Sequence, residues 1–172
     1  VNSLSGNEAA VILGDFVFSA AFRLCATLND AATTETIGRT GMNLCAGELI
    51  QLTNRGHFAL DESAYFRLIE GKTASLIATS AALGAKHAGA DSPTITRFHR
   101  FGTSIGLAFQ IQDDLLDLTG DQLAVGKPLG KDLALGKLTL PVIHHLSHAS
   151  PASKARTLLA LDAAVRGAPL PD

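Results

Sequence analysis

The sequence of 172 residues has no tryptophan, one methionine and two cysteines, and apolar and polar residues rarely alternate as they do in a strand. The lack of alternation disfavours a β-rich fold. Because the first residue is Val1 and the only methionine is Met42, we expect the sequence to be a fragment of a longer chain. Cys25 and Cys45 lie in apolar helical patterns, so we expect two buried, reduced thiols and a cytoplasmic protein.

Long apolar runs without charge are also missing. The longest runs, such as residues 73–85, are far shorter than the roughly 20 residues that cross a membrane, and no secretory signal is visible. The formal net charge of −2 points to neither a nucleic acid nor a membrane surface as partner. The mean hydropathy of +0.23 is high, which leaves open a buried helical core, an oligomer interface or a surface bared by truncation.

Apolar residues instead recur every three to four positions, which predicts an all-α fold in one domain. Asp61, Ser92 and Ser150 are the expected N-caps of three helices, the last two being followed by proline. The spacing of Gly102 and Gly106 predicts a close helix–helix contact. The expected helices cover residues 7–28, 31–52, 62–88, 92–119, 141–148 and 151–165, with a loop at 120–136 and a frayed end at 168–172.

The segment 109–117 carries the most distinctive pattern, FQIQDDLLD, because three carboxylates end a predicted helix. Asp113 and Asp117 lie about 40° apart on one helix face, with Asp114 at its edge. Two carboxylates about 6 Å apart repel by roughly 3 kcal/mol at an effective dielectric constant of 20, and a helix end of this kind prefers cations. A divalent cation would remove both penalties, and oxygen-only ligands favour Mg²⁺, Mn²⁺ or Ca²⁺ over zinc. The alternative is a solvated acidic helix end.

A basic loop follows this acidic helix end. Residues 126–137, GKPLGKDLALGK, hold three lysines against one aspartate. Glycines let a backbone approach a ligand closely, and lysines place ammonium groups on phosphate oxygens. Lys72 and Thr73 add a cation and a hydroxyl from within a helix. The combination suits a metal–phosphate complex, whereas the alternative is a flexible surface connection.

With these motifs in place, the chain resembles a known family. The segment from Phe109 to Lys137 resembles the second aspartate-rich region of trans-isoprenyl diphosphate synthases, also called polyprenyl synthetases. Three further segments match that family in the same order, and the resemblance extends from residue 1 to about residue 146. The overall pattern is most similar to long-chain members of octaprenyl or solanesyl type, which make quinone side chains. The three further segments are Gly14-Asp15-Phe16, residues 47–52 (GELIQL) and Lys72-Thr73-Ala74.

The resemblance implies a bundle of long antiparallel helices around a central cavity, usually as a homodimer. The implied enzyme joins isopentenyl diphosphate head-to-tail to an allylic diphosphate, with Mg²⁺, or Mn²⁺, holding the diphosphate that leaves. The residues assigned to the metal are Asp113, Asp114 and Asp117, with Asp113 the expected direct ligand. Lys72, Lys127 and Lys137 are assigned to binding of the allylic diphosphate and to catalysis. Thr73 and Gln110 are assigned to the reacting carbon, and Phe109, next to Gln110, is assigned to substrate binding. Lys131 matches the family less clearly.

The sequence departs from the family pattern at both ends. No Asp-Asp pair precedes Asp113, so the family's first aspartate-rich motif and the arginine pair after it are missing, and the helices expected after Val165 are cut short. We therefore expect a partial polyprenyl synthetase domain over residues 1–172 that is inactive alone. The alternatives are a non-catalytic partner subunit of a heteromeric synthase, a shorter-chain farnesyl or geranylgeranyl synthase, and a cyclising terpene synthase, whose second metal motif normally includes Asn and Ser or Thr.

Overall fold

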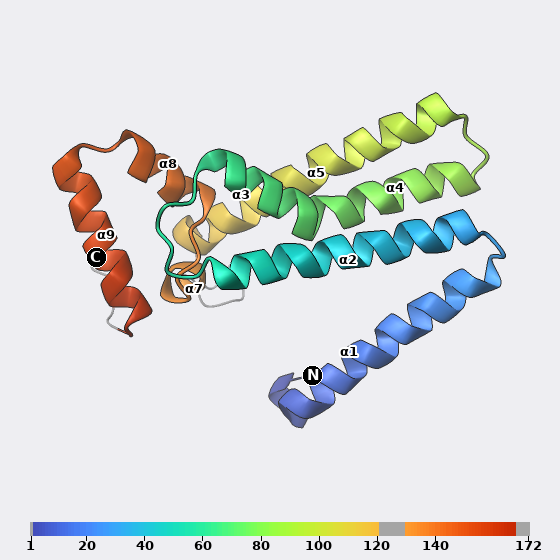
Figure 1. Ribbon diagram of the computed structural model, residues 1–172, viewed down its shortest axis with the longest axis horizontal. Helices are drawn as coiled ribbons and strands as arrows, with labels where there is room; N and C mark the ends of the chain where they lie inside the picture. The colour runs from blue at the N-terminus through green and yellow to red at the C-terminus, as the bar shows by residue number, and fades with distance from the viewer. Residues whose placement is uncertain (1, 121–129, 168–172) are drawn as a thin grey trace. The chain divides into compact units, whose positions relative to one another are not determined.

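The computed structural model describes residues 2–120 and 130–167, apart from the side chain of Ser3, and every regular element in these ranges is helical (Figure 1). The predicted all-α class is confirmed. The elements are α1 (Asn2–Thr27), α2 (Ala31–Thr53), α3 (Glu62–Ile69), the π-helical turn η1 (Glu70–Ala74), α4 (Ser75–His87), α5 (Ser92–Thr119), α7 (Lys131–Ala134), α8 (Leu140–His148) and α9 (Pro151–Val165).

Two compact units make up the chain, residues 1–40 and 41–172. In the first unit, Asn29 adopts a left-handed conformation with φ of 51° between α1 and α2, which lets the chain reverse direction. The Asp30 carboxylate then accepts the backbone N–H of Thr33 at 3.1 Å and its hydroxyl at 2.7 Å, which fixes the start of α2. Cys25 is buried in this unit, as predicted.

The two cysteines differ in their surroundings, and the prediction of a buried Cys45 is wrong. Cys45 lies two positions from the buried Gly47 on α2, which places the two residues on opposite sides of the helix. Because the Gly47 side carries the contact with the rest of the second unit, the Cys45 side faces solvent.

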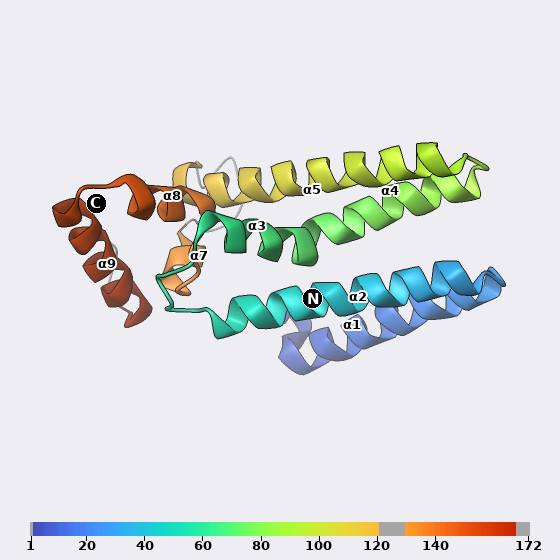
Figure 2. The ribbon, with the colours of Figure 1, turned by 45° about the horizontal axis from the view of Figure 1, so that its top comes forward.

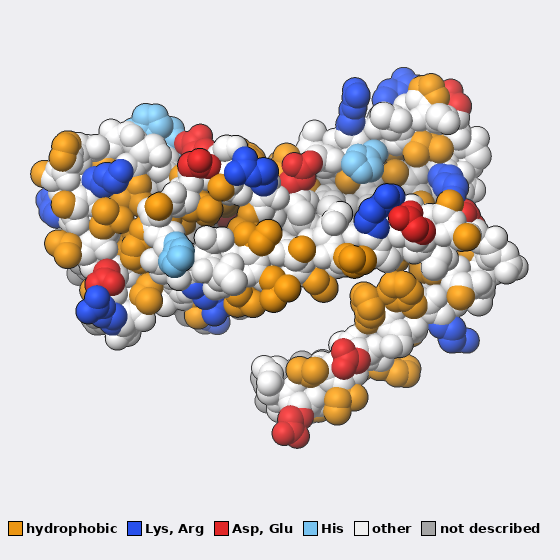
Figure 3. All heavy atoms as spheres, viewed as in Figure 1, with side chains coloured by type: hydrophobic (Ala, Val, Ile, Leu, Met, Phe, Trp, Pro, Cys, Tyr) orange, Lys and Arg blue, Asp and Glu red, His pale blue; other side chains and the backbone are white. Residues whose placement is uncertain are grey.

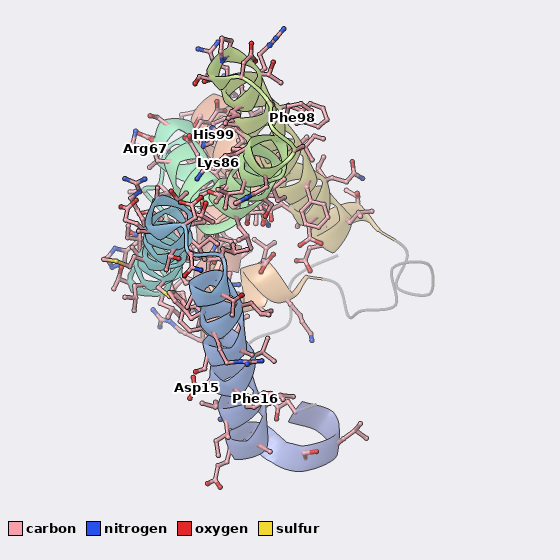
Figure 4. All side chains as sticks on the ribbon, turned by 90° about the vertical axis from the view of Figure 1, so that its right-hand side faces the viewer. Asp15, Phe16, Arg67, Lys86, Phe98 and His99 are labelled. Carbon is pink, nitrogen blue, oxygen red and sulfur yellow. The ribbon has the colours of Figure 1, made fainter. Side chains whose placement is uncertain are left out.

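The surface of α1 is unusually apolar. Gly6, with φ of 80° and ψ of 172°, kinks this helix, so its regular part begins at Asn7, as predicted. Residues 4–27 are long and apolar enough to cross a membrane by length and composition alone, a test that core helices and signal sequences also pass. Figure 3 shows hydrophobic side chains on its surface, and Figure 4 shows Asp15 and Phe16 projecting from it. The exposed apolar side chains include Val11, Ile12, Phe16, Val17, Phe18 and Leu24.

In the second unit, α3, η1 and α4 follow one another without a break, and α5 lies alongside α4 in both ribbon views (Figures 1 and 2). The single helix predicted for residues 62–88 is confirmed in extent, but five residues of it form a π-helical turn. The close contact predicted for the α5 glycines is also present. A Cβ on Gly102 would lie 2.6 Å from the Cα of Ala78, and one on Gly106 would overlap Ala74 in η1.

The helix caps confirm two predictions and correct one. Asp61 accepts the N–H of Ala64 at 2.6 Å at the start of α3, and Ser150 accepts that of Ser153 at 3.3 Å at the start of α9. Ser92, however, is the first residue of α5 rather than its cap. Asp91 takes the capping position and accepts the N–H of Thr94 at 3.0 Å. The charged carboxylate one residue earlier therefore outcompetes the hydroxyl for the free N–H groups.

The predicted loop at 120–136 contains a short helix, α7, so the loop prediction is wrong for residues 131–134. Residues 121–129 of that loop, and the frayed end predicted for 168–172, lie outside the described ranges. Leu133 anchors α7 in the core. Gly136 ends it with φ of 70°, and its carbonyl accepts the N–H of Gly56 at 2.9 Å, an approach that leaves no room for a Cβ. The core of this unit comprises Tyr65, Leu68, Ile69, Leu133, Leu138, Ile143, Leu146 and Leu161.

Candidate functional site

The carboxylates at the end of α5 face the interior of the second unit. Asp114 is 4% exposed and Asp117 is 5% exposed, whereas Asp113 is half-buried. The sequence placed Asp113 and Asp117 on one face, but the pair that the fold buries together is Asp114 and Asp117. These two residues are three positions apart, so they also share a helix face, and protein donors from α3, α5 and α7 approach that face.

A chain of hydrogen bonds joins η1, α5 and α3 through Asp114. The Thr73 hydroxyl donates to Oε1 of Gln110 at 2.8 Å, and Nε2 of Gln110 donates to Oδ1 of Asp114 at 2.9 Å. The phenol of Tyr65 donates to the other oxygen, Oδ2, at 2.6 Å. Three residues that the sequence assigned to the site, Thr73, Gln110 and Asp114, therefore form one network, and Tyr65 closes it.

The electrostatics of this network follow from its burial. Burial raises the pKa of Asp114 above its usual range, even though the hydrogen bonds from Tyr65 and Gln110 and the positive charge of Lys72 act in the opposite direction. The negative charge of Asp132 adds to the increase. Burial and the hydrogen bond to Asp114 likewise raise the pKa of the Tyr65 phenol, which therefore stays protonated as a donor at neutral pH.

Lys72 enters the site from η1. Its ammonium group donates to Oε1 of Gln51 at 2.9 Å and lies 3.4 Å from Oε1 of Glu48, and its side chain is only 14% exposed. Gly47 makes this approach possible, because a Cβ there would lie 3.0 Å from the backbone nitrogen and the Cβ of Lys72. Two segments of the family resemblance, residues 47–52 and Lys72 with Thr73, thus meet in space. Turns of the π type are frequently found at functional sites.

Asp117 positions the basic segment that follows α5. Its Oδ2 accepts the backbone N–H of Asp132 at 3.2 Å, and its carbonyl accepts the N–H of Gly130 at 2.8 Å. The Asp132 carboxylate in turn lies 3.3 Å from the ammonium group of Lys137. Lys137 also lines a small hollow together with Gln51, the residue that binds Lys72. Gln51 therefore lies close to both predicted lysines, because it binds Lys72 and lines the same hollow as Lys137.

The remaining predicted residues lie in different settings. Phe109 is 62% exposed on α5, and Lys131 is exposed at the start of α7. Lys127 lies outside the described residues. In the described ranges, no three His, Cys, Asp or Glu side chains are grouped so as to hold a metal ion without other ligands. The assignment of Asp113, Asp114 and Asp117 to a metal therefore stays a prediction.

The sequence patterns missed several residues of the site. Tyr65 belongs to no motif and lies 49 positions from its partner Asp114, so no local signal identifies it. Gln51 and Glu48 belong to the matching segment 47–52, and their positions relative to Gly47 place all three on neighbouring parts of the same helix. Asp132 is the one acid in an otherwise basic segment, so the composition gives no sign of a role for it. Its backbone N–H and its carboxylate instead connect Asp117 to Lys137.

Comparisons with known proteins agree with this geometry. The polyprenyl synthetase family profile matches residues 1–166. Heptaprenyl diphosphate synthase component 2 of Geobacillus stearothermophilus is 40% identical over 141 residues, which are 82% of this chain and 44% of that protein. Octaprenyl diphosphate synthase of Escherichia coli is 35% identical over 150 residues, 87% of this chain and 46% of that protein. The chain therefore spans less than half the length of these relatives.

A solved structure extends the likeness to three dimensions. The polyprenyl synthase of Caulobacter crescentus, crystallised with calcium and isoprenyl diphosphate, superposes with a TM-score of 0.88 at 31% identity, over 95% of this chain and 50% of that one. Sequence and fold thus agree over nearly all of the 172 residues. This chain belongs to the polyprenyl synthetase family.

Proposed function

We propose that the chain is the part of a trans-polyprenyl diphosphate synthase that binds the allylic diphosphate and carries the second aspartate-rich motif. In the proposed reaction, the allylic carbon–oxygen bond breaks and diphosphate leaves. The double bond of isopentenyl diphosphate attacks the resulting allylic cation, and loss of a proton restores an alkene. The observation that carries this proposal is the hydrogen-bonded network of Thr73, Gln110 and buried Asp114, with half-buried Lys72 beside Thr73 in the same turn.

Each group in the site has a role in this chemistry. The ammonium groups of Lys72 and Lys137 would neutralise the negative charge that grows on the departing diphosphate. The Thr73 hydroxyl donates a hydrogen bond to Oε1 of Gln110, so the oxygen lone pairs of Thr73 are left to stabilise positive charge on the allylic carbon. We retain Lys127 and Phe109 as proposed substrate-binding residues on the family resemblance alone.

The donor set also fits Mg²⁺. This ion is usually held by one or two carboxylates together with substrate phosphate oxygens and water, and not by a complete cage of protein ligands. Half-buried Asp113 and the neighbouring carboxylates of Asp114 and Asp117 offer that kind of partial site. Bound Mg²⁺ would supply charge stabilisation to the leaving diphosphate. The crystallised Caulobacter relative contains calcium and isoprenyl diphosphate together, which supports a site of this class.

The first test measures ligand binding to the 172-residue chain itself. Calorimetric titration with inorganic diphosphate should show binding that depends on Mg²⁺. The variant Asp113→Asn should weaken this binding about tenfold or more, because it removes the proposed ligand. Asp162→Asn is the matched control, since Asp162 is a half-exposed acid on α9 paired with Arg166. Equal binding by all three proteins, or no binding at all, would contradict the proposal.

We further propose that catalysis also needs the family's first aspartate-rich motif, which these 172 residues do not contain. The chain alone should not incorporate radiolabelled isopentenyl diphosphate into longer products. In a fusion protein, the segment of the E. coli octaprenyl synthase that lies before its matched region would be joined to Val1. This fusion should incorporate isopentenyl diphosphate into longer products, and Asp113→Ala should abolish that activity. Turnover by the unfused chain would disprove the requirement for the first aspartate-rich motif.

A second candidate function has one observation in its favour. The G. stearothermophilus relative is named as component 2 of its enzyme, so that protein works with another component. If this chain had the same role, the active fusion would require an added partner, whereas a complete homodimeric synthase would not.

Among the finer assignments, we propose a long-chain product for quinone side chains, a homodimer and a cytoplasmic location. Product analysis of the active fusion by chromatography tests the chain length directly.

A further inference from the structure

Tyr65 is the residue that closes the hydrogen-bonded network at Asp114, and both its ring and its hydroxyl are held by neighbouring groups. It is 2% exposed on α3, in contact with the apolar core, and its ring packs edge-on to Phe66 with the centroids 5.7 Å apart. Its hydroxyl is directed at the carboxylate of Asp114 at 2.6 Å. A hydrogen bond of this length to a charged acceptor is among the strongest a neutral side chain can make.

The direction of every hydrogen bond in the network follows from this contact. An ionised carboxylate only accepts, so both Tyr65 and Gln110 must donate to Asp114. Once the amide nitrogen of Gln110 is committed to Asp114, its oxygen faces Thr73 and accepts the hydroxyl proton there. The orientation of the Thr73 lone pairs is therefore set two hydrogen bonds away, at the Asp114 carboxylate.

Both oxygens of Asp114 are held by different elements, Oδ2 from α3 and Oδ1 from within α5. Without the phenol hydroxyl, one oxygen of a carboxylate that is 4% exposed would lose its protein donor. A buried acceptor without a donor is costly, so the carboxylate would rotate toward water and out of its fixed orientation. Rotation would release Gln110 and with it the orientation of Thr73.

We propose that Tyr65 is a positioning residue of the diphosphate site, whose hydroxyl locks Asp114 and, through Gln110, orients Thr73. This inference rests on the proposed function, because it assigns Tyr65 to the same site. It differs from a packing role in one respect. Only the hydroxyl carries the effect, whereas the ring serves the core.

The test is a double-mutant cycle on the 172-residue chain, with Tyr65→Phe, Asp114→Ala and both changes together. The readout is binding of Mn²⁺ in the presence of inorganic diphosphate, followed by the loss of the free-ion electron paramagnetic resonance signal. Tyr65→Phe keeps the buried ring, so the helical circular dichroism should match that of the unmodified chain. We expect Mn²⁺–diphosphate binding to weaken about tenfold, as is usual when a group that orients a metal ligand is removed.

The cycle separates positioning from packing. If Tyr65 acts through Asp114, adding Tyr65→Phe to Asp114→Ala should change binding by less than twofold, because the side chain that Tyr65 positions is already absent. Independent, additive losses would overturn the inference. Ser147→Ala is the matched control, since it removes a hydroxyl that donates to Ile143 on α8, away from the site. Unaltered binding by Tyr65→Phe would overturn this inference alone, and no binding by the unmodified chain would overturn it together with the proposed function.

Discussion

At the scale of single residues, the burial of Asp114 disfavours the ionised form of its side chain. Its pKa is raised above the unfolded value, chiefly by burial, so the folded chain binds its proton more tightly than the unfolded chain. That stabilising contribution is complete at pH values below the unfolded pKa of about 3.9 and is lost as the pH rises through the folded pKa. Above that pH range the ionised carboxylate destabilises the fold relative to the protonated form.

Asp114→Asn is expected to remove that penalty. Its amide oxygen can accept from Tyr65, while its nitrogen donates to Gln110 after the Gln110 amide has flipped, and Gln110 then donates to Thr73. Every buried polar group keeps a partner. Thermal unfolding followed by circular dichroism at pH 7 should give a midpoint equal to or above that of the unmodified chain, with the difference shrinking as the pH falls. A midpoint several degrees lower at pH 7 would contradict the raised pKa of Asp114.

Tyr65 provides a second test at this scale, because the chain has one tyrosine and no tryptophan. Its raised phenol pKa means that the folded chain keeps a proton that the unfolded chain releases near pH 10. This contribution to stability is complete below about pH 10 and is lost as the pH rises further. The near-ultraviolet phenolate absorbance should therefore appear together with loss of helical circular dichroism. Phenolate formed near pH 10 in a fully helical chain would show that Tyr65 is not buried as described.

At the scale of elements, the contact between α5 and η1 depends on glycine. Gly106→Ala would place a methyl group on Ala74, so we expect a loss of about 1–3 kcal/mol in the free energy of unfolding, measured with urea. The shifted η1 should also weaken diphosphate binding, because Lys72 and Thr73 lie in that turn. Gly84→Ala is the control, since nothing lies within 4 Å of its new Cβ, and it should stabilise the chain by up to about 1 kcal/mol. Equal effects of the two changes would argue against a tight contact.

The same contacts explain which elements the sequence could predict. The long helices and the Asp61 and Ser150 caps follow from local periodicity and short-range hydrogen bonds, and these predictions are confirmed. The π-helical turn was missed because it accompanies close packing against Gly47 and Gly106, which no window of sequence contains. The helix α7 was missed because its four residues are too few for a periodic pattern.

The site shows the same division between local and distant information. Composition and spacing identified the acids and Gln110, which belong to one helix, and the family resemblance supplied Lys72 and Thr73. The Tyr65–Asp114 bond joins residues 49 positions apart and depends on how α3 packs against α5. Burial of Asp117 likewise depends on a donor from α7, the helix that the sequence did not reveal.

At the scale of the whole molecule, the apolar surface of α1 predicts self-association. Water-soluble monomers rarely expose large contiguous apolar patches, yet Phe16 is 69% exposed and Ile12 is 68% exposed on this helix. The homodimer implied by the family resemblance would cover such a surface. Sedimentation equilibrium across the micromolar range should therefore give an average mass above the 17.9 kDa of one chain, rising with concentration.

Substitutions on α1 separate specific association from general stickiness. Phe16→Ser combined with Ile12→Ser should shift the mass toward that of one chain, because the change removes two large side chains from the exposed face. Leu159→Ser is the matched control, since Leu159 is 72% exposed on α9, away from α1 in the sequence. If Leu159→Ser lowered the mass as much as the α1 changes did, association would not be specific to α1. A mass of one chain at every concentration would contradict the predicted homodimer for these 172 residues.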